Sequence, residues 1–184
     1  MQKTVFTFGL ISGLIIVVLG FATQALLMGD NGEMDMSKGE IFGYLTMIVA
    51  LSMIFFGIRQ FRDRHLSGLI SFGQAFKVGF LIALIASAIY VIGWMVYYNT
   101  SETAHNFPAK YLEHMKEQWA ASGISQDEIN ARSAGLAKNM ESYKNPIIMA
   151  GMTLMEILPV GLIISLLSAL ILKRKNNNPK LSPN

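Results

Sequence analysis

Four long apolar blocks dominate the chain, and polar stretches separate them. The blocks cover residues 5–28, 41–58, 78–98 and 147–172, and the first three contain no charged residue. A helix rises about 1.5 Å per residue and a bilayer core is about 30 Å thick, so about 20 apolar residues cross it. A soluble four-helix bundle would need a polar face on each helix, which these blocks lack. The pattern predicts an all-α integral membrane protein with four transmembrane helices.

Helix-start signals precede two of the blocks. Ser37 and Glu40 form a capping box before the second block, and Pro146 suits the first turn of the fourth. A cleaved signal peptide is the alternative for the first block, but signal cores are only about 7–15 residues long. Residues 23–25 are also a poor cleavage site, so we expect the first block to be retained as a span.

The connection at residues 99–146 has a helical pattern of its own. Apolar residues fall on one helical stripe at Phe107, Pro108, Tyr111, Leu112, Met115 and Trp119. Gly123 is a plausible C-terminal cap, and Ser125 to Glu128 form a second capping box. The following helix carries Ile129, Leu136, Met140 and Tyr143 on one side. We expect an αα-hairpin whose segment 103–144 is a candidate contact for an envelope protein partner.

The composition of the chain agrees with a membrane protein, and its charges predict how it is oriented in the membrane. The chain is 52% hydrophobic and 15% charged, and its net charge is +3. Four spans place both termini and the second connection on one side, with nine basic residues and one acidic residue. The other side has six basic and ten acidic residues. The positive-inside rule then predicts an inner-membrane protein with cytoplasmic termini, a flexible cytoplasmic tail at 176–184 and an extracytoplasmic hairpin.

Basic residues on the expected cytoplasmic side alternate with aromatic ones. Such a mixture occurs in nucleic-acid binding, but beside two spans it fits an interfacial segment among anionic lipid headgroups better. We expect no nucleic acid partner. The expected headgroup contacts are Arg59, Arg62, Arg64, Lys77, Lys173, Arg174 and Lys175.

Catalytic and metal-binding motifs are absent from the sequence. There is no cysteine, no histidine pair at helical spacing, no nucleophile elbow, no phosphate loop and no dinucleotide fingerprint. We therefore expect no enzyme activity, no cofactor and no metal.

Glu156 is the one charged residue inside a block. A carboxylate at this depth costs several kcal/mol, so the neutral acid or a polar partner is expected. Equal depth on other spans gives Ser52, Ser87 and Tyr90 as candidate partners. Two interpretations stay open: Glu156 carries a proton or binds substrate, or it links helices through a hydrogen bond.

Small residues line one side of the first and the fourth block. They are Gly9, Gly13, Gly20, Gly161, Ser165 and Ser168. Small residues let helix backbones approach in lipid, so we expect the first and fourth spans to pack closely against one another. A homo-oligomer through the same face stays open.

Several longer motifs carry a family resemblance. They are residues 42–48, 56–58 with Arg62 and Asp63, 71–79 and 155–161. As a set they resemble the bacterial membrane proteins of domain-of-unknown-function family 4199. The resemblance implies the four-span layout and a bacterial envelope setting, and it implies no activity.

Two function classes remain from the sequence. The favoured one is a non-enzymatic scaffold or accessory subunit of the envelope. The alternative is a small, proton-coupled transporter that works through Glu156. Transporters commonly show internal repeats and several intramembrane polar groups, whereas this sequence has no repeat and one intramembrane charge.

Overall fold

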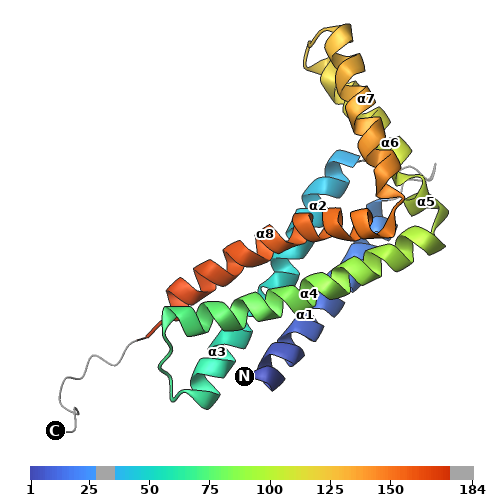
Figure 1. Ribbon diagram of the computed structural model, residues 1–184. Coiled ribbons are helices and arrows are strands. Elements are labelled where there is room, and N and C mark those ends of the chain that lie inside the picture. The colour runs from blue at the N-terminus through green and yellow to red at the C-terminus, as the bar shows by residue number, and fades with distance from the viewer. Residues whose placement is uncertain (28–35, 175–184) are drawn as a thin grey trace, which may run out of the picture.

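The computed structural model describes residues 1–27 and 36–174, and every regular element in these two ranges is a helix. Figure 1 shows a bundle of long helices from which a helical pair projects at one end. The eight helices are α1 (Gln2–Leu27), α2 (Met36–Leu51), α3 (Met53–His65), α4 (Phe72–Thr100), α5 (Glu102–His105), α6 (Phe107–Ala121), α7 (Gln126–Tyr143) and α8 (Pro146–Leu172). The expected tail at 176–184 lies outside the described residues.

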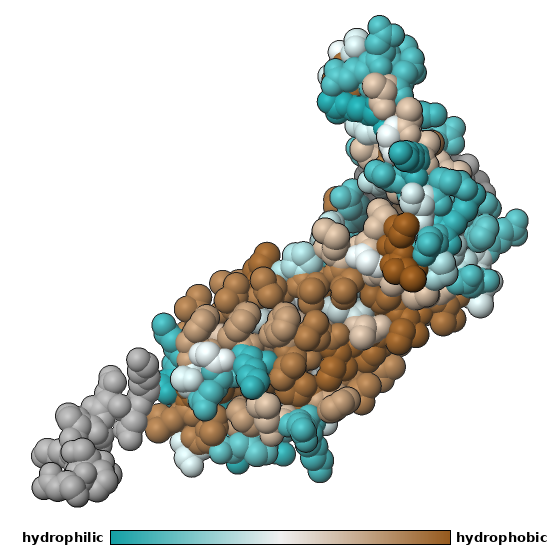
Figure 2. All heavy atoms as spheres, in the orientation of Figure 1, coloured by the Kyte–Doolittle hydropathy of each residue, from teal (hydrophilic) through white to brown (hydrophobic). Residues whose placement is uncertain are grey.

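Four segments are long and apolar enough to cross a membrane, as the sequence predicts: α1, the α2–α3 unit from Lys38 to His65, α4 and α8. Large apolar side chains cover their outer surface, and Ile147 is 82% exposed. Figure 2 shows this apolar surface between two polar ends. Such a surface would be costly in water and is matched by lipid, so the fold is that of a membrane protein.

Helix α4 occupies the centre of the bundle and packs against α1, α3 and α8 (Figure 1). The prediction that the first and fourth spans pack closely on one another is wrong, because α1 and α8 lie on either side of α4. The small residues do allow close approach, but to α4. A Cβ atom at Gly9 would lie 2.7 Å from Ile85 Cβ, and one at Gly161 would lie 2.9 Å from Ala83 Cβ.

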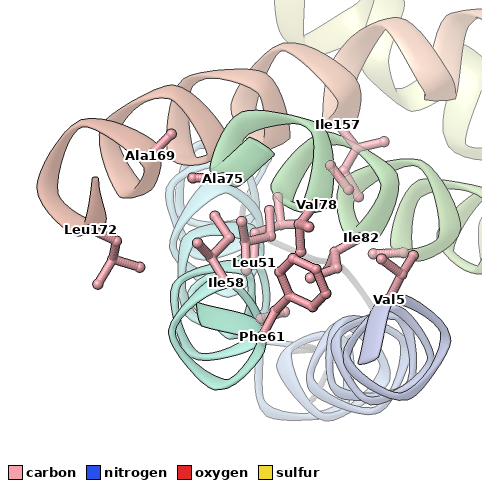
Figure 3. Packing of buried hydrophobic residues seen from close by; sticks show 14 of the residues in the cluster. Val5, Leu51, Ile58, Phe61, Ala75, Val78, Ile82, Ile157, Ala169 and Leu172 are labelled. Carbon is pink, nitrogen blue, oxygen red and sulfur yellow. The ribbon is translucent and has the colours of Figure 1, made fainter. Parts of the chain in front are cut away.

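The buried core is aliphatic and lies where α3, α4 and α8 meet. Figure 3 shows Leu51 and Ile58 of the α2–α3 unit beside Val78 and Ile82 of α4, with Ile157 coming from α8. All five residues are 0% exposed. Ala75, Ala83 and Ala86 of α4 are fully buried in this cluster and leave room for the branched side chains of the neighbouring helices.

The second apolar block forms two helices instead of one. The irregularity lies at Ser52, whose backbone N–H donates to the Ile48 carbonyl at 3.0 Å. The Ser52 hydroxyl donates to the Val49 carbonyl at 2.6 Å. This hydroxyl satisfies a carbonyl of its own helix, so the local break leaves the backbone hydrogen-bonded within lipid.

The connection between the second and third spans is shorter than the expected segment from Arg59 to Lys77, because both helices extend into it. A full capping box, which sequence inspection missed, starts α4: Ser71 accepts from the Gln74 backbone N–H, and the Gln74 side chain accepts from the Ser71 backbone. Ile70 and Arg174 exchange two backbone hydrogen bonds of 3.1 and 2.9 Å. These bonds fix the end of α8 to this connection.

Caps in the projecting region follow the sequence signals. Gly123 adopts φ +76°, and the Ser125 hydroxyl accepts from the Glu128 backbone N–H, as predicted. The Glu128 carboxylate pairs with Arg132 instead of completing the capping box. The Ser37 capping box differs from expectation because α2 already begins at Met36, and the Ser37 side chain lies outside the described part of the chain.

Candidate functional site

A cavity of about 450 Å³ lies between the helices at the end of the bundle that carries α5–α7. Its walls come from the second half of α1, residues 39–47 of α2, the second half of α4 and the first half of α8. Helices α6 and α7 add residues from the projecting pair. This volume is in the range of small-molecule sites.

Glu156 lines this cavity as the eleventh residue of α8. Its neighbours differ: Ile157 is fully buried in the core, and Met155 is 78% exposed on the outside. Glu156 itself is exposed within the cavity, and in the described ranges it forms no hydrogen bond or ion pair. The carboxyl group is therefore available to a molecule that occupies the cavity.

Aromatic side chains make up much of the lining. They come from five helices and comprise Phe21, Tyr44, Tyr90, Trp94, Tyr97, Phe107, Tyr111 and Tyr143. The Trp94 ring packs edge-on against Phe107 of α6 at 5.9 Å between centroids, and its indole N–H donates to the Tyr143 hydroxyl of α7. Trp94 thereby connects α6 and α7 to the spanning helix α4 beside the cavity.

The charged groups of the lining are acidic. Glu40 and Glu156 are present, and no lysine or arginine occurs among the described lining residues. Burial and the charges of Glu40, Tyr44 and Glu156 raise the pKa of Tyr111 on α6. The phenol therefore stays neutral at pH 7.

Further polar groups complete the lining. His114 lies on α6, where its Nε2 atom is 3.0 Å from the Gln118 amide nitrogen. The Thr153 hydroxyl donates to the Met149 carbonyl of its own helix at 2.9 Å. Among the residues that the structure describes, no group of three or more potential metal ligands forms. The arrangement suits binding of an organic molecule.

The candidate partners of Glu156 occupy three different settings. Tyr90 lines the same cavity, whereas Ser52 bonds within its own helix and Ser87 is fully buried with no hydrogen-bond partner for its hydroxyl. The structure therefore brings Tyr90 and Glu156 into one site and leaves the two serines outside its lining.

The residues that we expected at helix contacts also occupy different settings. Gly13 contacts Ile89 of α4 in the same way as Gly9 contacts Ile85, and Ser165 is fully buried with its hydroxyl on the Gly161 carbonyl at 2.7 Å. Ser168 is 4% exposed. Gly20 differs because nothing lies within 4 Å of its Cβ position, and it lines the cavity instead of a helix contact.

Arg62 differs most from its expected role as a headgroup contact. It is 9% exposed, its Nε donates to Asp63 at 2.7 Å, and its terminal nitrogen donates to the Leu172 carbonyl at 3.4 Å. The guanidinium thus caps the C-terminal end of α8, where a positive charge is favourable. Exposed basic side chains at this end are Arg59, Arg64, Lys77, Lys173 and Arg174, while Lys175 lies outside the described residues.

Sequence reasoning missed the aromatic lining. Trp94 and Tyr97 end the third apolar block, where aromatic residues are typical of a membrane interface, and Tyr111 and Tyr143 belong to the apolar stripes of the expected hairpin. The available signal was that aromatic residues gather at the same end of several spans, together with Glu40 and Glu156.

Comparison with known proteins gives a family for the chain. The family described as Protein of unknown function (DUF4199) matches residues 7–174. The chain belongs to this family. No curated protein and no solved structure matches it. The match covers nearly the whole of the DUF4199 chain, including the four spans, the projecting helices and the cavity.

Proposed function

We propose that this DUF4199 protein is a non-enzymatic membrane protein that binds a small ligand between its spanning helices. The cavity around Glu156 carries this proposal, because it combines the volume of a ligand site with aromatic walls and a carboxyl group that forms no ion pair with any residue the structure describes. Such a site suits the small transporter that was the alternative from the sequence.

The proposed orientation places both termini in the cytoplasm of a bacterial cell. The excess of basic residues at the end with Arg59, Arg64 and Arg174 supports this orientation, and anionic headgroups are their proposed contacts. Helices α5–α7 then lie outside the inner membrane, and the cavity lies in the outer half of the bilayer.

The experiment fills the cavity without disturbing the helix contacts. Gly43 and Gly151 both have nothing within 4 Å of their Cβ positions, but only Gly43 lines the cavity. Gly43→Phe should therefore occupy the cavity, and Gly151→Phe is the matched control on the outer surface. The three proteins are purified in a mild non-ionic detergent, and mass spectrometry identifies the small molecules and lipids that stay bound.

We expect a bound small molecule in the wild-type protein and in Gly151→Phe, and its loss from Gly43→Phe. Equal amounts in all three proteins, or no bound molecule in the wild type, would contradict the proposal. Thermal unfolding of each variant shows whether it is folded.

A scaffold or accessory subunit is the second candidate. It is favoured by the projection of α6 and α7 away from the bundle, with a largely polar surface (Figures 1 and 2). In that case Gly43→Phe should restore any phenotype of a deletion strain as well as the wild type does. Failure of a folded Gly43→Phe protein to do so would favour the ligand-binding function.

A further inference from the structure

The chemistry of the cavity restricts the class of molecule it accepts. We propose that the cavity between α1, α2, α4 and α8 binds an organic cation, such as an amine or a quaternary ammonium group, with its charge near Glu156. This inference rests on the proposed ligand-binding function and adds the ligand class to it.

The charge of the lining is the first argument. Glu156 is exposed inside the cavity, it forms no ion pair in the described part of the chain, and Glu40 adds a second carboxyl group. No described lining residue carries a fixed positive charge. An anion would meet repulsion in surroundings of low dielectric constant, where a like charge is costly. A cation would gain a partner there.

The aromatic walls are the second argument. Eight lining side chains are phenylalanine, tyrosine or tryptophan, and they line the same cavity as the two carboxyl groups, from α1, α2, α4, α6 and α7. The faces of such rings attract cations, and tryptophan attracts them most strongly. The rings also bury the alkyl groups of an organic ammonium ion, which a hydrated metal ion does not have.

The absence of a metal-ligand cluster in the described residues is the third argument. Glu40, His114 and Glu156 line the cavity but do not converge as a group that could hold a metal ion. A volume of about 450 Å³ also exceeds what a single bare ion requires. The combination of dispersed acid groups and aromatic walls favours a larger cation of low charge density.

Three probes of nearly the same shape test the ligand class. Choline carries a positive charge, 3,3-dimethylbutan-1-ol replaces the nitrogen with carbon and is neutral, and 3,3-dimethylbutanoate is an anion. Saturation-transfer NMR on the full chain in a maltoside detergent gives their relative affinities. Gly43→Phe, whose cavity is filled, corrects for probe taken up by the detergent. Choline should bind about tenfold more tightly than the alcohol, and the anion should bind most weakly.

Carboxylate variants connect the preference to the site. Glu156→Gln keeps the size of the side chain and should weaken choline binding about tenfold while leaving the alcohol unchanged. Glu117→Gln is the control, because Glu117 is an exposed residue of α6 that does not line the cavity. It should leave both probes unchanged.

The outcomes separate the two proposals. Equal binding of choline and the alcohol, or tighter binding of the anion, would overturn the cation inference and leave the ligand-binding function standing. Binding of none of the three probes would contradict both. A choline preference that Glu156→Gln does not reduce would also overturn the inference, because the charge would then lie elsewhere.

Discussion

The contact between α1 and α4 depends on the absence of a side chain at Gly9. A Cβ atom there would lie 2.7 Å from both Cβ and Cγ2 of Ile85 and 3.4 Å from the Ile82 carbonyl oxygen. Real side chains do not approach a Cβ atom this closely. The Ile85 Cβ atom is bound directly to the α4 backbone, so rotation of the side chain cannot relieve the overlap. Gly9→Ala must therefore push the two helices apart.

The expected cost follows from two opposing terms. Overpacking a close contact costs about 1–3 kcal/mol. Alanine also favours a helix over glycine by roughly 0.5–1 kcal/mol. The difference predicts that Gly9→Ala lowers the free energy of unfolding by up to about 2.5 kcal/mol, and by about 1 kcal/mol at the middle of both ranges. Gly20→Ala lies on the same helix with nothing within 4 Å, so only the favourable term applies and it should be neutral or stabilising.

Thermal unfolding and denaturant titration in one detergent compare the two alanine variants with the wild type. The prediction is an ordered series in which Gly9→Ala is the least stable protein and Gly20→Ala is at least as stable as the wild type. A Gly9→Ala protein as stable as Gly20→Ala would refute the close approach of α1 to α4. It would also reopen the packing of α1 on α8 that the sequence alone favoured.

Three further predictions concern other parts of the chain. In intact cells, an impermeant thiol reagent should label Ser122→Cys and not Arg64→Cys, and the reverse pattern would invert the proposed orientation. Arg62→Met should lower the free energy of unfolding by about 1–3 kcal/mol, measured by denaturant titration, because the Leu172 carbonyl loses its buried donor; an unchanged stability would show that this cap is dispensable. A peptide of residues 103–144 should show weak helicity in water by circular dichroism, since so small a helical pair has too little core, and cooperative unfolding would show an independent domain.

The sequence predicts the helices well because lipid leaves the backbone few alternatives. An apolar block of sufficient length must satisfy its own hydrogen bonds, and a helix does so. Start signals at Ser125 and Pro146 and the turn at Gly123 are local, so they could also be recognised. The capping box at Ser71 was equally local but lay within a segment interpreted as an interfacial connection.

The order of the helices could not be predicted in the same way. Each span is apolar on all sides, so its sequence does not say which side faces a neighbour. Gly9 and Gly161 indicate close contacts, yet they do not indicate that α4 supplies the partner in both cases. A contact is a property of two surfaces, and one sequence pattern describes only one of them.

The cavity could not be predicted from local sequence patterns, for a related reason. Glu156 is conspicuous in the sequence because a carboxylate in a membrane is costly in free energy. Trp94 and Tyr143, in contrast, are explained locally as residues of a membrane interface and of a hairpin. Their common site arises only when residues of α6 and α7 meet the ends of the spans. The sequence therefore gives the charge at the site, and the fold gives the aromatic surroundings.

The cavity requires that water reaches Glu156, and the lack of native cysteines allows this access to be measured directly. Thiols react with methanethiosulfonate reagents as thiolates, which form in water and not in lipid or a dry core. Rates are measured with the ethyltrimethylammonium reagent for Glu156→Cys, for the outward-facing Met155→Cys and for the buried Ser87→Cys. We expect fast modification of Glu156→Cys and slow modification of the other two. A rate at Glu156→Cys no greater than that at Ser87→Cys would contradict the existence of an accessible cavity.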